Sequence, residues 1–143
     1  MTINYKKIMN ANIINILKDV LKIIDKEGIV NGHHLYITFM TNHPKVVIPS
    51  WLKEKYPNEI TIIIQYEYYN LKIFKNYFSI TLSFNNIKAD LKIDYDAIIS
   101  FADPQANFGL KIKDNENLQK NVRKLRKSKK NNVIDFNNYK KTN

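Results

Sequence analysis

The sequence predicts a mainly β domain that begins with one long α-helix and ends in a flexible C-terminal tail. Apolar residues recur at helical spacing from Tyr5 to Glu27, alternate with a period of two after Gly28, and lose all periodicity from Lys113 onward. The chain has 143 residues, of which 44% are hydrophobic, so it is long and apolar enough for one compact domain. We therefore expect a small antiparallel β-sandwich or barrel, of the Sm-like or SH3-like kind.

The N-terminal helix is predicted from a stretch without Pro or Gly, and Gly28 stands where helices commonly end. Its apolar stripe is wider than one sheet face requires, which favours a second contact surface. We expect this surface to pair with the same helix of a second copy, so residues 1–28 are predicted to be a dimerisation helix packed on the domain. The residues predicted for the dimer interface are Ile13, Leu17, Val20 and Ile24.

The segment 29–112 is predicted to form the β domain. Apolar and polar residues alternate at 35–40, 60–65 and 78–84, and the short connections favour antiparallel strands. Hairpin turns are predicted at Asn70, at 75–76 and at 85–86, because asparagine tolerates positive φ. A short helix is predicted from 49 to 57, a second from Asp94 to Phe101, and a closing strand at 108–112.

The formal charge of +10 is concentrated in the tail. Residues 1–112 contain 13 basic and 10 acidic groups, whereas 113–143 contain 10 basic and 3 acidic groups. Lysine supplies 21 of the 23 basic residues, although base-reading surfaces favour arginine. We expect 113–132 to be a flexible basic linker. Apolar residues return at 133–143, which is typical of a linear docking motif.

Catalytic and metal chemistry have little support in the sequence. The absence of cysteine excludes disulfides, thiolate-bound zinc and cysteine nucleophiles, and is typical of a reducing cytoplasm. Neither a membrane span nor a secretory leader is evident. His33, His34 and His43 are predicted to lie in loops, and no nucleophile motif or Gly-rich phosphate loop is present. We expect no enzymatic activity, no metal and no cofactor.

Aromatic residues leave three interpretations open. Tyr66, Tyr68 and Tyr69 crowd the end of one predicted strand, and Phe101 and Phe108 bracket a loop. These rings can be ordinary core packing. They can instead wall a groove for an extended peptide. The third interpretation is a small RNA-binding protein of Sm-like or OB-like build, with the three tyrosines as stacking platforms and the tail as a phosphate binder.

Short motifs occur throughout the segment 36–112, and they favour the peptide interpretation. The first of them begins one residue before the segment. In order they are LYITFMT at 35–41, VIP at 47–49, YP at 56–57, ITIIIQ at 60–65, FSITLSF at 78–84, YDA at 95–97, FADP at 101–104 and FGL at 108–110. This segment resembles the SspB family (stringent starvation protein B), adaptors of the ClpXP protease, and its alphaproteobacterial branch in particular. Relatives typically have Phe-Gly-Gly where this chain has Phe84-Asn85-Asn86.

The resemblance implies an adaptor that captures ssrA-type degradation tags, forms a homodimer and tethers tagged proteins to the ClpX unfoldase. The tag-binding residues that it implies are Gln65, Tyr66, Ser83, Phe84, Asn85, Phe101, Ala102 and Phe108. The implied ClpX-docking residues are Val133, Ile134, Asp135, Phe136, Tyr139 and Lys140. Neither a membrane nor a nucleic acid is an expected partner.

Overall fold

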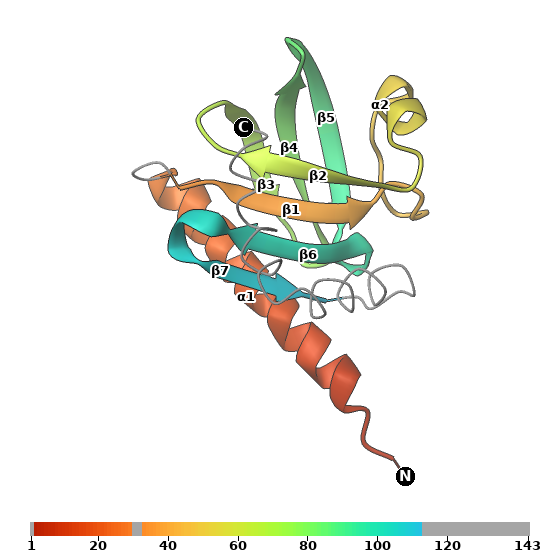
Figure 1. Cartoon of the computed structure of the whole chain (residues 1–143), viewed down its shortest axis with the longest axis vertical. Coiled ribbons are helices and arrows are strands. Elements are labelled where there is room, and N and C mark those ends of the chain that lie inside the picture. Colours follow the sequence, from red (N-terminus) through yellow and green to blue (C-terminus); the bar gives the residue numbers. More distant parts are fainter. Residues whose placement is uncertain (1, 30–32, 113–143) are drawn as a thin grey trace, which may run out of the picture.

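The structure, a computed structural model, describes residues 2–29 and 33–112, which form one N-terminal helix and two antiparallel sheets (Figure 1). The first sheet has the strand order β2-β1-β6-β7 and the second has the order β3-β4-β5. The predicted fold class is therefore confirmed. The elements are α1 (Tyr5–Glu27), β1 (Leu35–Met40), α2 (Ser50–Lys55), β2 (Glu59–Ile64), β3 (Tyr68–Ile73), β4 (Tyr77–Phe84), β5 (Ile87–Asp94), the 3₁₀ turn η1 (Tyr95–Ala97), β6 (Ile98–Asp103), the 3₁₀ turn η2 (Pro104–Ala106) and β7 (Phe108–Lys111).

Helix α1 begins and ends where its sequence provides caps. The Asn4 side chain accepts a hydrogen bond from the Lys7 backbone N–H at 3.0 Å, which satisfies a free donor of the first turn. Gly28 adopts a φ of 78°, and its N–H donates to the Ile24 carbonyl at 2.7 Å. No helix within 2–29 and 33–112 has the length and apolar content needed to cross a membrane.

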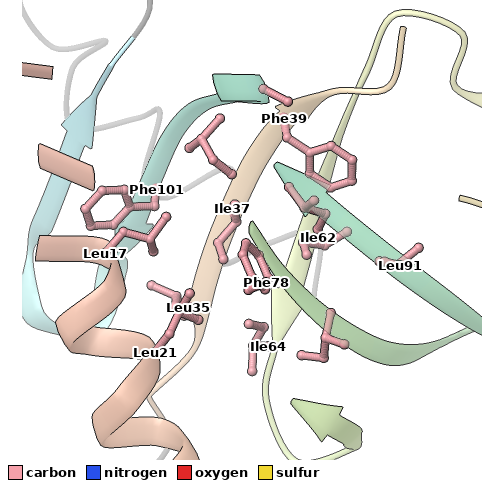
Figure 2. Packing of buried hydrophobic residues seen from close by; sticks show 14 of the residues in the cluster. Leu17, Leu21, Leu35, Ile37, Phe39, Ile62, Ile64, Phe78, Leu91 and Phe101 are labelled. Carbon is pink, nitrogen blue, oxygen red and sulfur yellow. The ribbon is translucent and has the colours of Figure 1, made fainter. Parts of the chain in front are cut away.

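The buried face of α1 packs into the core of its own chain. Leu17 and Leu21 are fully buried and point toward Phe101 and Leu35 (Figure 2). Three of the four residues predicted for a dimer interface, Ile13, Leu17 and Ile24, belong to this core, and Val20 packs against it. On the solvent side of α1, Tyr5, Met9, Ile16 and Ile23 form an exposed apolar stripe, and Ile8 is exposed beside it.

The two sheets share one core. The residues buried in it include Phe39 of β1, Ile62 of β2 and Phe78 of β4 (Figure 2). Tyr95 of η1 belongs to this core, and burial raises the pKa of its hydroxyl to about 12. Its hydroxyl donates to the Phe74 carbonyl at 3.3 Å.

Two predicted local structures are wrong. The helix predicted from Asp94 to Phe101 is a single 3₁₀ turn followed by β6. Asp94 does cap this turn, accepting from the Asp96 N–H at 2.9 Å. The residues after it enter the sheet because β6 pairs with β1 on one side and with β7 on the other, and such tertiary pairing overrides local propensity.

The hairpin turn predicted at Asn70 is instead an irregularity inside β3. Asn70 has a φ of 54°, and the pairing of β3 with β4 shifts register between Tyr69 and Lys72. The positive φ expected of Asn70 is confirmed, but it occurs at a register shift within β3 and not in a hairpin turn. The turn predicted at 85–86 is confirmed, since Asn85 and Asn86 have φ values of 50° and 68° and join β4 to β5.

Replacing Leu17 by Ala should lower the free energy of unfolding by about 2–5 kcal/mol, because it leaves a cavity between α1 and the sheet. The matched control is Ile8→Ala on the same helix, where the side chain is 54% exposed. That control should cost less than about 1 kcal/mol in the monomer. Urea unfolding followed by circular dichroism measures both, and equal losses would contradict the assigned faces of α1.

Candidate functional site

A groove of about 690 Å³ runs beside β2. It lies between β2, the short helix α2 and the end of the β4–β5 hairpin, three elements that Figure 1 shows around the same side of the molecule. Its lining residues are Trp51, Leu52, Lys55, Tyr56, Ile60, Thr61, Ile63, Gln65, Tyr66, Glu67, Leu82, Ser83, Phe84 and Asn85.

The groove follows from the position of β2 at the edge of its sheet. Within the described residues β2 pairs only with β1, and after Ile64 the chain crosses to β3 in the other sheet. An edge strand leaves a row of backbone N–H and C=O groups without sheet partners. Ile60, Ile62 and Ile64 point into the core, so Thr61 and Ile63 face the groove.

Four aromatic residues, Trp51, Tyr56, Tyr66 and Phe84, line the groove. Trp51 of α2 contacts Phe84 of β4 edge to face, with ring centroids 6.4 Å apart, and so joins the helix to the hairpin. Tyr56 adds a ring beside α2, and Ser83 contributes a small polar side chain. Asn85 completes the hairpin end in a left-handed conformation that asparagine tolerates and glycine favours, which suits a tight turn between β4 and β5.

Five of the eight predicted tag-binding residues line this one groove. They are Gln65, Tyr66, Ser83, Phe84 and Asn85, which come from β4, from the turn after it and from the loop after β2. Tyr66 is 76% exposed, so its ring is available to a partner. Residues that are far apart in the sequence thus meet at a single surface.

The other three predicted residues lie elsewhere. Phe101 and Phe108 line a second, apolar cavity of about 270 Å³ near the C-terminal end of α1. Their ring centroids are 6.3 Å apart. Ala102 shares a row of β6, β1 and β2 with Tyr36 and Ile63, two strand spacings or about 10 Å from the groove-lining Ile63.

Several groove residues were not predicted from the sequence. Thr61 and Ile63 could have been found, because the alternation of 60–65 already separates them from the buried isoleucines. Trp51, Lys55 and Tyr56 have no such signal. Their place in the groove depends on where α2 packs, which no periodicity of their own segment predicts.

The histidines have structural partners rather than metal-binding ones. His33 Nδ1 lies 2.8 Å from Asp103 Oδ2 at the mouth of the second cavity. Asp103 Oδ1 also accepts from the Ala106 N–H at 3.3 Å, which caps η2. Across 2–29 and 33–112, His, Cys, Asp and Glu side chains nowhere gather in threes to hold a metal ion. Among the described groove residues, Glu67 is the one carboxylate, and none is His or Cys.

The three clustered tyrosines point in different directions. Tyr66 lines the groove, whereas the Tyr68 hydroxyl donates to the Ile24 carbonyl of α1 at 3.4 Å. The Tyr69 ring lies under the Lys88 ammonium, at 4.3 Å from the centroid. They therefore do not form one continuous stacking platform of the kind that single-stranded RNA uses.

The comparison with known families decides the relationship. The family model of stringent starvation protein B, SspB, matches residues 7–142, which is nearly the whole chain. The chain belongs to the SspB family. A search of curated proteins found no match. SspB proteins are adaptors associated with the ClpXP protease, and membership supports that general role here.

Ser83→Trp should fill the groove and weaken peptide binding by at least about 10-fold, because an indole would occupy the space of a bound side chain. The side chain is only half-buried, so the melting temperature should change by no more than a few degrees. Fluorescence anisotropy and thermal unfolding measure the two effects. Ala102→Trp is the companion variant, at a predicted tag-binding residue of β6 that does not line the groove. Normal binding by the Ser83 variant would place the site outside the groove.

Proposed function

We propose that this SspB-family chain binds ssrA-type degradation tags in the groove beside β2 and delivers tagged proteins to the ClpXP protease in the cytoplasm. The observation that supports this most directly is the meeting of Gln65, Tyr66, Ser83, Phe84 and Asn85 around one open groove. Binding, rather than catalysis, suits a groove walled by aromatic rings with a single carboxylate.

The edge of β2 provides a physical mode of tag recognition. An extended peptide laid along this edge would gain main-chain hydrogen bonds and become a fifth strand of the sheet. Its alternate side chains would then meet Thr61 and Ile63 on one side and the rings of Trp51 and Phe84 on the other. Main-chain pairing supplies affinity, and these side chains supply selectivity.

Delivery to ClpX rests on the family resemblance. The implied docking residues, Val133, Ile134, Asp135, Phe136, Tyr139 and Lys140, and the linker 113–132 lie outside the described residues. In the proposal, the docking motif holds the adaptor on ClpX while the groove holds the tag. Such tethering raises the local concentration of the tagged protein to about the millimolar range for a short flexible linker.

A homodimer is the proposed assembly, with the exposed stripe of α1 as its contact. Met9, Ile16 and Ile23 are spaced by seven residues and so lie nearly on one line of the helix, with Tyr5 one turn earlier. All four are exposed. This surface replaces the buried residues predicted from the sequence, and a dimer would offer ClpX two docking motifs.

Titration of the full chain with a labelled ssrA tag peptide from the same organism tests the binding function. Saturable binding is expected, and it should persist when 113–143 are deleted, because the groove belongs to the β domain. Single-stranded RNA is the matched competitor. If RNA binds and the tag does not, or if tag binding requires the basic tail, the protein is not a tag adaptor.

Deleting 133–143 should leave tag affinity unchanged and abolish the acceleration of ClpXP degradation at low substrate concentration. The reason is that the groove remains while the tether is lost. Degradation of a tagged fluorescent protein measures the effect, and neutralising the lysines of 120–130 is the control with the docking motif intact. Undiminished acceleration by the truncated protein would contradict the tether.

Ile16→Asp combined with Ile23→Asp should dissociate the dimer, since each buried isoleucine contributes about 1.5–3 kcal/mol. Ile8→Asp is the control, because Ile8 is also exposed but lies off the stripe. Sedimentation velocity reports the mass of each. A wild-type chain that remains monomeric at every concentration tested would exclude this assembly.

A further inference from the structure

The two ends of the groove differ in charge. Among the described residues that line it, only Lys55 and Glu67 carry a formal charge. Lys55 ends α2, four residues before β2 begins, and Glu67 follows the last residue of β2 by three. The two charges therefore flank opposite ends of the strand, separated by a strand length of about 20 Å.

Within the described residues Lys55 and Glu67 have no salt-bridge partner, and Glu59, the exposed first residue of β2, does not line the groove. The side chains of Lys55 and Glu67 are both exposed. The Lys55 ammonium lies 5.8 Å from the centre of the Tyr56 ring, which also lines the groove, so the charge stands over the groove wall. Two unpaired charges of opposite sign at the ends of an open strand edge form an electrostatic polarity that a bound peptide would experience.

The direction of a bound peptide follows from the strand that it would join. Every strand pair in the two sheets is antiparallel, and antiparallel pairing is slightly more stable than parallel pairing. A peptide antiparallel to β2 has its C-terminal end beside Lys55 and its N-terminal end beside Glu67.

We propose that Lys55 and Glu67 select an extended peptide with an acidic residue toward its C-terminal end and a basic residue or free amine about six residues earlier, held antiparallel to β2. This inference rests on the proposed peptide-binding function and specifies the class of peptide and its direction. Each contact lies at the solvent-exposed rim, so the charges choose between peptides and speed their association more than they add affinity.

Two capped eight-residue peptides test the proposal. One is Ala-Lys-Val-Ala-Thr-Val-Ala-Asp, with its charges six residues apart, and the other has Lys and Asp exchanged, so that composition and net charge are the same. Titrations followed by two-dimensional NMR of the isotope-labelled full chain give both affinities even when binding is weak. The lysine-first peptide should bind about 5- to 10-fold more tightly at low salt. This preference should largely disappear at 1 M salt, where the Debye length is about 3 Å.

Charge-exchanged proteins provide the decisive comparison. Lys55→Glu combined with Glu67→Lys should invert the preference without changing the net charge of the chain. The matched control is Lys53→Glu combined with Glu54→Lys, two exposed residues of α2 that do not line the groove, and it should keep the wild-type preference.

Equal affinities, no binding of either peptide, or a preference that the Lys55 and Glu67 exchange leaves in place would overturn the proposal. A wild-type preference for the aspartate-first peptide would also overturn it, since the peptide would then run parallel to β2. The ssrA tag peptide, titrated in the same experiment, distinguishes a failure of this inference from a failure of the proposed function. If the tag binds without any charge selection, only this inference fails; if the tag does not bind, the proposed function fails with it.

Discussion

The unpaired edge of β2 is the constraint on which the rest of the site depends. Because the chain leaves the four-stranded sheet after Ile64 and starts the second sheet at β3, the backbone of β2 has a strand partner on one side only among residues 2–29 and 33–112. A long exposed edge invites pairing with any other strand. Here α2 and the β4–β5 hairpin stand beside the edge, joined by the contact of Trp51 with Phe84. The groove of about 690 Å³ occupies the space between them and this edge.

The core fixes which side chains reach this edge. Ile60, Ile62 and Ile64 are almost completely buried, so a slip of β2 by one residue would expose all three and turn Thr61 and Ile63 inward. The free energy of burying these isoleucines therefore also fixes which side chains of β2 face the groove. Two strands away in the same sheet, Phe101 of β6 packs beside Leu17 of α1 in the same core as these isoleucines (Figure 2). Packing in one part of the domain thereby positions a binding surface in another.

Much of this architecture is encoded in local patterns. The period of α1 and the alternation of β2 and β4 were readable because burial on one face repeats along each element, and Gly28 marked the end of α1. The 94–101 segment was assigned to a helix because its cap is local, whereas its pairing with β1 and β7 is not. The groove residues divide in the same way, between those named beforehand and those placed by the packing of distant elements. Five residues of the groove were named through a family resemblance, but the separation of Phe101 and Phe108 from it, and the inclusion of Trp51, depend on how distant elements pack.

Amide hydrogen exchange on the full chain, with and without bound tag peptide, tests most directly whether a peptide joins the edge of β2. The tag should slow exchange within β2, Glu59–Ile64, and at the adjoining Gln65, where the peptide would supply hydrogen-bond acceptors and exclude water. Slower exchange confined to the cavity of Phe101 and Phe108, with β2 unchanged, would show that the peptide does not join this strand.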